Sequence, residues 1–208
     1  SYYIMKIYIL RHEDRTQDAT MFSPLTEKGL SNALKLSKEL NKLNINIIYS
    51  SPFVRTLQTV YPYSSGSDTK VNLEYSIAEM QDQKIIPEKS YQVRLPKYLA
   101  EMFNYNSNYN SMIYPEDFKY PEKDRDVQSR ARKFLLKVFN NHSETNDTIL
   151  IVTHQAVCNS ILNIIAKKGD TCLDKHTIPS YNYPTGGVTK VFDKNCWKFK
   201  PVNWEYEK

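Results

Sequence analysis

Short apolar runs alternate along this chain with longer segments of helical periodicity. Residues 7–10, 45–49 and 148–153 are rich in β-branched and aromatic side chains, as buried strands are. Residues 30–40 and 124–141 instead repeat their apolar side chains at helical spacing. The alternation predicts an α/β fold, a three-layer αβα sandwich built on a mainly parallel sheet.

Other segments complete this prediction. Residues 70–75 form a third strand candidate, and residues 187–192 and 195–200 predict a hairpin that adds an antiparallel C-terminal edge to the sheet, with Asp193-Lys-Asn195 as its turn. No repeat or linker divides the chain, so we expect residues 1–208 to form a single domain. An irregular, site-covering excursion is expected at about 79–122, with one helix around residues 91–103.

Two helix starts carry recognisable signals. Thr26 is suited to cap a helix whose first turn holds Glu27. Ser51 is suited to cap the next one, with Pro52 at the first helical position and Arg55 in the first turn. On the helix at 124–141 the apolar stripe is expected to be core and the basic side chains off it to be solvated, namely Arg125, Arg130, Arg132 and Lys133.

Composition narrows the classes of function. Hydrophobic residues make up 40% of the 208 and charged residues 25%, as in ordinary soluble globular proteins. No apolar run reaches the roughly 18 residues that span a bilayer, so no membrane partner is expected. The net charge of +5 is mild and dispersed. It argues against nucleic acid as a partner and suits a small anionic or phosphorylated one.

The cysteines and the first residues of the chain indicate a cellular compartment. The chain holds three widely spaced cysteines, an odd number, which favours free thiols in a reducing compartment. Residues 1–20 show no signal-peptide pattern. We therefore expect a cytoplasmic protein in which Cys158 is a buried thiol of a helix.

Charged and titratable residues come directly after the C-terminal ends of several predicted strands. Arg11 and His12 end the first strand, with Arg15 just beyond; Arg55 follows the second and His154 the strand at 148–153. Open α/β sheets bind ligands at the carboxyl ends of their strands. Taken alone, the Arg11-His12 stretch fits a solvated loop equally well, Arg55 fits a solvated helix face better, and His154 fits a structural role better. Their repetition at strand ends predicts a shared site.

A carboxylate is expected to complete the site. Glu79 lies a few residues past the third strand, with Glu74, Asp82 and Glu88 as competitors. Two histidines, two or three arginines and a carboxyl group suit phosphoryl transfer through a phosphohistidine. One imidazole attacks phosphorus, a second donates to an equatorial oxygen, and the carboxyl group protonates the leaving oxygen while the arginines neutralise the phosphate. No motif has metal-ligand spacing, so neither metal nor cofactor is expected.

Four blocks together resemble the histidine phosphatase superfamily, also called phosphoglycerate-mutase-like. They are Leu10-Arg-His12, Pro24-Leu-Thr-Glu-Lys-Gly29, Ser50-Ser-Pro-Phe-Val-Arg-Thr-Leu-Gln-Thr59 and Val152-Thr-His154, and their order matches over about residues 4–192. The spacing through residues 71–79 resembles the branch of the Sts-type protein tyrosine phosphatases and a transcription-factor subunit with a phosphatase domain. The resemblance implies that His12 is the phosphorylated nucleophile and Glu79 the proton donor. It also implies a phosphate pocket completed by Arg11, Arg55 and His154, with Arg15 assisting.

Two residues depart from the family pattern. Glu13 stands where the family motif has glycine, and Gln155 stands where a glycine or small residue usually follows the second histidine. Glycine tolerates backbone angles and close ligand approach that glutamate does not. A carboxylate at position 13 faces one of two situations: it repels the phosphate, or it points outward and pairs with Arg15 or a lysine. The departures leave open a degenerate, non-catalytic member.

The sequence thus predicts a metal-independent phosphomonoesterase of the histidine acid phosphatase type. The alternatives are a phosphate-binding or protein-interaction module without turnover, and a phosphoglycerate-mutase-type phosphotransferase. The substrate, a phosphorylated small molecule or a phosphopeptide, is left open, and so is the oligomeric state, with a homodimer as one option. The geometric expectation is definite: the imidazoles of His12 and His154 lie close together, flanked by Arg11 and Arg55.

Overall fold

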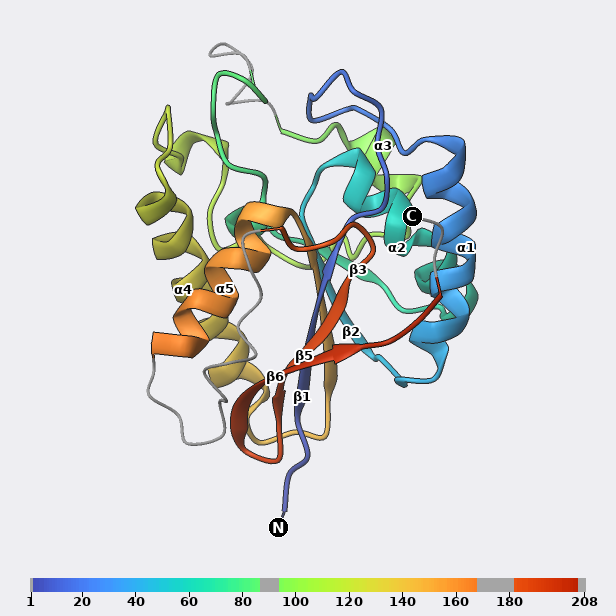
Figure 1. The fold of residues 1–208 in the computed structure, drawn as a ribbon, viewed down its shortest axis with the longest axis vertical. Helices are drawn as coiled ribbons and strands as arrows, with labels where there is room; N and C mark the ends of the chain where they lie inside the picture. Colours follow the sequence, from blue (N-terminus) through green and yellow to red (C-terminus); the bar gives the residue numbers. More distant parts are fainter. Residues whose placement is uncertain (1, 87–93, 168–181, 206–208) are drawn as a thin grey trace.

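The computed structural model describes residues 2–86, 94–167 and 182–205, and its centre is a six-stranded sheet (Figure 1). The strand order is β3-β2-β4-β1-β5-β6. The strands are β1 (Lys6–Arg11), β2 (Ile47–Ser50), β3 (Val71–Leu73), β4 (Thr148–Thr153), β5 (Val188–Asp193) and β6 (Cys196–Val202).

Strand directions confirm the predicted fold class. Strands β1 to β4 pair in parallel, whereas β5 pairs antiparallel with β1, and β6 antiparallel with β5. The sheet is therefore mainly parallel with an antiparallel C-terminal edge. The register pairs Arg11 of β1 with Thr153 of β4, so the carboxyl ends of these central strands lie at the same level.

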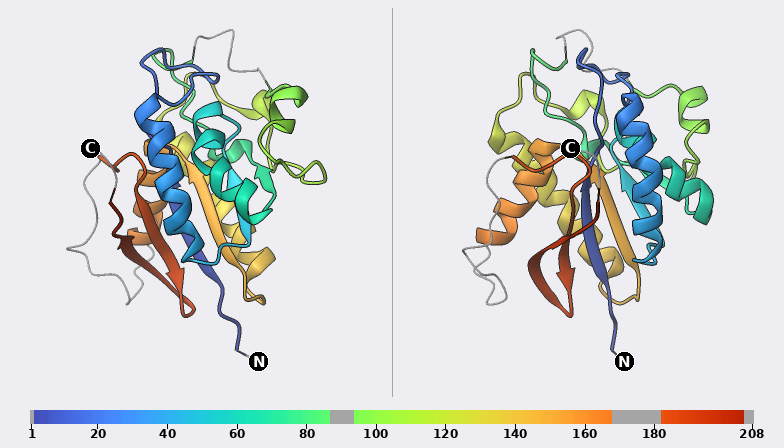
Figure 2. Two further views of the ribbon diagram at one scale, coloured as in Figure 1. Left: turned by 90° about the vertical axis from the view of Figure 1, so that its right-hand side faces the viewer. Right: turned by 45° about the vertical axis from the view of Figure 1, so that its right-hand side comes forward.

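Helices cover both faces of the sheet (Figures 1 and 2). Helices α1 (Glu27–Asn41) and α2 (Val54–Ser67) lie on one face, and α4 (Asp124–His142) and α5 (Gln155–Lys167) lie on the other. The chain between β3 and α4 is less regular. It contains the 3-10 turns η1 (Tyr75–Ile77) and η3 (Pro115–Asp117) and the short helix α3 (Lys97–Glu101).

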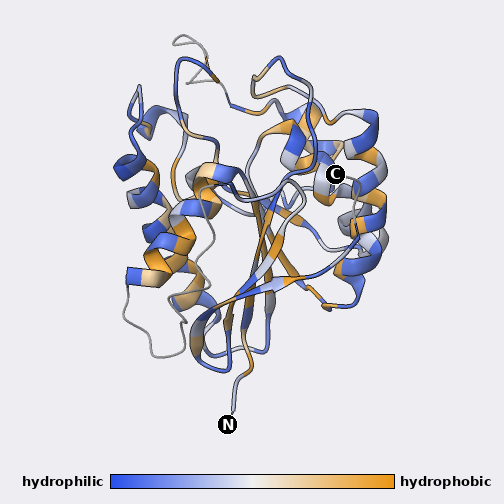
Figure 3. Ribbon diagram, in the orientation of Figure 1, coloured by the Kyte–Doolittle hydropathy of each residue, from blue (hydrophilic) through white to orange (hydrophobic). Residues whose placement is uncertain are grey.

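Alternate side chains of each central strand enter two separate cores. Leu10 and Val152 pack with α1 and α2, while Ile9 and Ile151 pack with α4 and α5. All four are fully buried. A strand covered on both faces reads as a continuous apolar run, which is why the sequence signal was strong. Figure 3 shows the hydrophobic residues on the strands and on the helix surfaces that cover them.

Of the two predicted helix starts, the first is confirmed and the second is wrong. Thr26 caps α1, and its side chain accepts a hydrogen bond from the amide of Gly29 at 3.1 Å. Helix α2 begins at Val54, so the assignment of Ser51 as cap and Pro52 as first helical residue was wrong. The hydroxyl of Ser51 is held elsewhere, at the nitrogen of a histidine described below.

The third strand and the helix after it are shorter than expected. Strand β3 ends at Leu73, because the side chain of Glu74 accepts a hydrogen bond from the amide of Ser76 and starts the turn η1. Helix α3 spans five residues within the expected 91–103, and residues 87–93 lie outside the described part. The C-terminal hairpin forms as expected, with Lys194 and Asn195 at positive φ in its turn.

The cysteines differ from expectation. Cys158 is a buried free thiol on α5, as predicted. Cys196, however, is disulfide-bonded, so the expectation of three free thiols, on which the cytoplasmic location rested, is wrong for this residue. Within residues 2–86, 94–167 and 182–205, no helix has both the length and the apolar character to cross a bilayer.

Two glycines make a matched pair for testing how α1 is docked. A methyl group at Gly29 would overlap the carbonyl oxygen of Asp14, which lies just after the Arg11-His12 pair, whereas one at Gly66 in α2 would meet nothing within 4 Å. We expect Gly29→Ala to lower the free energy of unfolding by about 1–3 kcal/mol through overpacking. Gly66→Ala is expected to raise it by about 0.4–1 kcal/mol by restricting the unfolded chain.

Urea unfolding followed by circular dichroism measures both changes. Equal, small effects of the two substitutions would contradict the tight contact between the first turn of α1 and the segment that follows β1.

Candidate active site

The two histidines of interest lie side by side at the carboxyl ends of adjacent strands. His12 directly follows β1 and His154 directly follows β4, and the amide of His12 donates to the carbonyl of Thr153 at 3.0 Å. The ring centroids are 5.3 Å apart. Parallel pairing of β1 with β4 therefore produces the proximity that the sequence analysis expected.

His12 is buried, and its tautomer follows from its neighbour. Its Nδ1 lies 2.7 Å from the backbone carbonyl oxygen of Glu13, which can only accept, so Nδ1 carries the hydrogen and Nε2 keeps a free electron pair. Burial, followed by the positive charge of Arg55, holds the pKa of His12 well below its ordinary value. The ring is therefore neutral at physiological pH.

His154 is fully buried and is also neutral. Burial and the charge of Arg55 keep its pKa well below the ordinary value. Its Nε2 lies 2.8 Å from the hydroxyl of Ser51. Its Nδ1 has no hydrogen-bond partner among the described residues and lies 3.4 Å from Oε2 of Glu79.

Arg55 is a fully buried cation on the first turn of α2. One Nη1–H donates to the carbonyl of Thr20 at 2.6 Å, but Nε and Nη2 have no hydrogen-bond partner in the described part of the chain. Nη2 lies 3.6 Å from Oε2 of Glu79. Burial lowers the pKa of Arg55 to about 10, so the guanidinium stays charged at neutral pH.

The two other arginines lie around the same centre. Arg11 donates through Nη1 to the carbonyl of Tyr183 at 2.5 Å, and its buried Nε has no partner among the described residues. Arg15 is half-buried and donates to the carbonyl of Thr16. The charges of Arg11 and Arg15 both lower the pKa of His12, which places them near its ring.

These unpartnered donors indicate an anion site. Buried N–H groups are normally hydrogen-bonded, and an unsatisfied buried one is costly, the more so on a charged group. Within the described residues, such donors occur on Arg11 and Arg55, and the buried Nδ1 of His154 lies without a hydrogen-bond partner beside them. A phosphate dianion, with its several acceptor oxygens, would satisfy them.

Of the three candidate carboxylates that the structure describes, Glu79 is the one that contacts this centre. It is 9% exposed, and its Oε1 accepts from the amide of Met80 while Oε2 faces Arg55 and His154. Glu74 is saturated instead by donors from its own turn and from the loop above it: Ser76, Tyr109, Ser111 and Met112. Asp82 accepts from the amide of Lys84, and Glu88 lies outside the described residues.

Glu13 turns its side chain away from the phosphate donors. Its carboxylate lies between Asn32 of α1, whose Nδ2 is 3.5 Å from Oε2, and Gly186, where a methyl group would overlap Oε1. Burial is the main cause that raises the pKa of Glu13 to about 7, and the charges of Asp14 and Lys28 contribute. The expected alternative, in which Glu13 points outward and pairs with Arg15, is wrong: Glu13 is buried, and the ion pairs of the described residues include none between the two. Gln155, the second departure, is the first residue of α5.

Two residues that contact this site or its surroundings were not predicted from the sequence. Ser51 was assigned to a helix cap, yet its hydroxyl contacts His154. Arg130 was expected to be solvated, which is wrong: it is 7% exposed and forms an ion pair with Glu122 at 2.9 Å. Glu122 precedes α4, so the pair has none of the three- or four-residue helical spacing that would have indicated it in the sequence.

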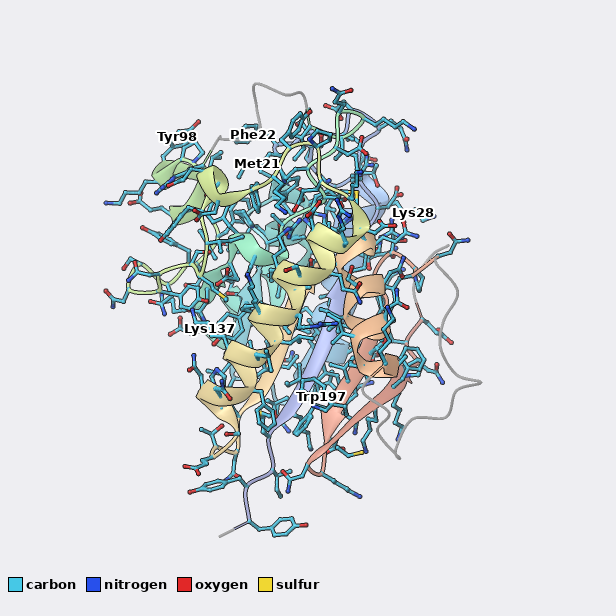
Figure 4. All side chains as sticks on the ribbon, turned by 90° about the vertical axis from the view of Figure 1, so that its left-hand side faces the viewer. Met21, Phe22, Lys28, Tyr98, Lys137 and Trp197 are labelled. Carbon is cyan, nitrogen blue, oxygen red and sulfur yellow. The ribbon has the colours of Figure 1, made fainter. Side chains whose placement is uncertain are left out.

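The loop after β1 covers the same end of the molecule. The carbonyl of Met21 accepts from the amide of Val54 at the start of α2, so this loop is tied to the helix that carries Arg55. Figure 4 shows Met21 and Phe22 at the upper end, toward which the carboxyl end of β1 points. In the part of the chain that the structure describes, no three His, Cys, Asp or Glu side chains are grouped as a metal ion would require.

Comparison with known proteins agrees with this geometry. The family model of the histidine phosphatase superfamily (branch 1) matches residues 7–204. The chain therefore belongs to the histidine phosphatase superfamily, as the four sequence blocks indicated.

Relatives in this superfamily are named as phosphatases. A probable phosphatase of Schizosaccharomyces pombe is 26% identical over 79% of this chain, and the match spans 55% of that relative's length. Phosphoserine phosphatase 1 of Hydrogenobacter thermophilus is 24% identical over 73% of this chain and 71% of its own. The crystal structure of ecdysone phosphate phosphatase from Bombyx mori shares the fold, with a TM-score of 0.70, 11% identity and coverage of 98% of this chain and 94% of that one. The two curated relatives are named as phosphatases, and the Bombyx mori structure shows that the fold is shared.

Glu13→Gln is expected to remove a decrease in the free energy of unfolding that occurs as pH rises. The pKa of Glu13 rises from 4.5 to about 7 on folding, so between these values the folded state binds the extra proton. The free energy of unfolding therefore falls, as pH rises through this range, by roughly 3 kcal/mol on account of this one group. Glutamine stays neutral, so the variant lacks this decline and is more stable than the wild type above pH 7.

Urea unfolding of both proteins at about pH 5 and about pH 8 measures the effect, those values lying on either side of the Glu13 titration. The lowered pKa values of His12 and His154 act in the opposite sense, reducing stability at low pH, and they cancel in the difference between the two proteins. An unchanged difference at the two pH values would contradict the burial of Glu13 as a titrating group.

Proposed function

We propose that this protein is a phosphomonoesterase that works through a phosphohistidine on His12, without a metal ion or cofactor. One observation carries the proposal. Two neutral, buried imidazoles lie 5.3 Å apart, and buried guanidinium N–H groups without partners in the described residues surround them.

Phosphate binding is assigned to the arginines. Arg11 and Arg55 each keep buried donors free after binding one backbone carbonyl, and Arg15 adds positive charge beside them. Donors fixed in advance stabilise the charge that spreads over the equatorial oxygens in the transition state, since they need no reorganisation when the reaction occurs.

The chemistry follows from the two histidines. Nε2 of His12, with its free electron pair, attacks phosphorus, and the bond from phosphorus to the ester oxygen breaks. We assign the hydrogen of the His154 ring to Nδ1, so that Nε2 accepts from the hydroxyl of Ser51, 2.8 Å away, and Nδ1 can donate to an equatorial oxygen.

Glu79 is assigned the proton transfers. In its protonated form the carboxyl group gives its proton to the leaving alkoxide; the carboxylate then takes a proton from the water that attacks the phosphohistidine. Its position supports this role, because Oε2 lies 3.4 Å from His154 and 3.6 Å from Arg55, beside the phosphate donors. The products are the alcohol and inorganic phosphate, and His12 is regenerated.

The proposed substrates are phosphorylated small molecules or phosphopeptides. The relatives are named for phosphoserine and ecdysone phosphate, which supports a small phosphomonoester. The chain spans about half the length of its yeast relative, so the activity and substrate of that whole protein are not transferred. The orientation of Glu13, away from the phosphate donors, favours turnover over the alternative of a binding module without catalysis.

Hydrolysis of p-nitrophenyl phosphate tests the proposal. The wild type is expected to release p-nitrophenol at the same rate with and without EDTA, since arginines provide the electrostatic stabilisation. His12→Ala is expected to lower kcat by about 10³-fold or more, because the covalent route is lost.

Thermal unfolding of His12→Ala serves as the control for its fold. A wild type no faster than this variant would contradict the enzyme hypothesis and favour the phosphate-binding module. Loss of activity in EDTA would contradict the metal-independent mechanism alone.

A further inference from the structure

Arg130 on α4 is a buried cation outside the group of phosphate donors. Its guanidinium donates through Nε and Nη2 to the two carboxylate oxygens of Glu122, at 2.9 and 3.0 Å. The same group donates through Nη1 to the carbonyl of Ser76 at 2.8 Å and through Nη2 to the carbonyl of Glu79 at 3.1 Å. It thus bridges α4 and the segment that bears the proposed acid.

Glu122 holds the same segment from its other end. Its Oε1 accepts from the amide of Gln81 at 2.8 Å, and its own amide donates to the carbonyl of Gln81 at 2.8 Å. The side-chain amide of Gln81 then donates to the carbonyl of Glu79 at 2.8 Å. Arg130, Glu122 and Gln81 are all buried, so water competes little for these bonds.

The backbone around Glu79 depends on this network. Residues 78–82 belong to no helix or strand, because η1 ends at Ile77, whose carbonyl accepts from Thr153 on β4. The carboxyl group of Glu79 itself accepts from the amide of the adjacent Met80, so its position follows the local backbone. A general acid must lie within hydrogen-bond reach of the leaving oxygen, and displacement by about 1 Å is enough to lower the rate strongly.

We infer that Arg130, paired with Glu122, is a positioning residue that sets the proton donor Glu79 against the leaving group. This inference rests on the proposed phosphatase function. Buried ion pairs are weak evidence of a gain in stability, because desolvation offsets their attraction. Here the guanidinium donates two further hydrogen bonds, to the backbone carbonyls of Ser76 and Glu79. An ion pair that only stabilised α4 would not need these two bonds.

The leaving group of the substrate distinguishes this role from a merely structural one. p-Nitrophenolate leaves without a proton, whereas the alkoxide of glycerol 2-phosphate needs one from the acid. Hydrolysis of the phosphohistidine is common to both esters and uses Glu79 as base, so the comparison is made on kcat/KM, which reports formation of the phosphohistidine. Arg130→Met is expected to lower kcat/KM for glycerol 2-phosphate by about 10²-fold and that for p-nitrophenyl phosphate by less than about threefold. Glu79→Gln is expected to show the same selective loss in kcat/KM and, in addition, slower hydrolysis of the phosphohistidine for both esters.

A double variant connects the two residues. If Arg130 acts through Glu79, adding Arg130→Met to Glu79→Gln will cause little further loss on glycerol 2-phosphate, because residues that act as a unit are non-additive. Multiplying losses would instead show that Arg130 acts elsewhere and would overturn the inference.

Further variants guard against unfolding. Arg130→Met leaves Glu122 buried without its partner, so the double variant Glu122→Met with Arg130→Met removes both charges together and is expected to keep the selective loss. Arg125→Met, on an exposed position of the same helix, is the matched control and is expected to match the wild type on both esters.

The outcomes separate the two hypotheses. An equal loss on both esters in the charge-neutral double variant, or no loss on either, would overturn the positioning role alone. A wild type that hydrolyses neither ester would contradict the proposed phosphatase function, and this inference would fail with it.

Discussion

The parallel pairing of β1 with β4 is the contact on which the site depends. Its register sets Arg11 beside Thr153, so the residues that follow, His12 and His154, leave the sheet at the same level. His12 and His154 are far apart in the sequence, and the backbone pairing of β1 with β4 alone is enough to make them neighbours. The bond from the amide of His12 to the carbonyl of Thr153 extends the ladder one residue past β1 and fixes this level.

The buried cations give the site its electrostatic character. Burial and the charge of Arg55 hold the pKa of both imidazoles well below the ordinary value, so Nε2 of His12 keeps its electron pair at neutral pH. Among the described residues, the guanidinium groups of Arg11 and Arg55 each bind one backbone carbonyl and keep a buried N–H group without a partner. The proposed affinity for a dianion would follow from these donors.

Much of the fold and the set of site residues could be predicted from the sequence. Strands covered on both faces and amphipathic helices produce strong local patterns, and strand ends in a parallel sheet converge by topology. What failed depended on contacts between distant segments. The start of α2 was predicted wrongly because the hydroxyl of Ser51 contacts His154 and does not cap the helix. Arg130 was predicted to be solvated because the carbonyls that it binds lie on another segment of the chain. The disulfide of Cys196 likewise has no local signal. The roles of the site residues remain proposals.

The ring of His12, the proposed nucleophile, is oriented by the main-chain carbonyl of residue 13 and not by the side chain at that position. Any residue supplies the same carbonyl, so evolution can vary position 13 without losing the tautomer of His12. What it cannot do freely is enlarge position 186, because Glu13 and Gly186 share one volume. Position 186 is restricted twice, by the carboxylate of Glu13 and by its own positive φ of 69°, so a smaller residue at position 13 would remove only the first restriction and position 186 is expected to stay glycine.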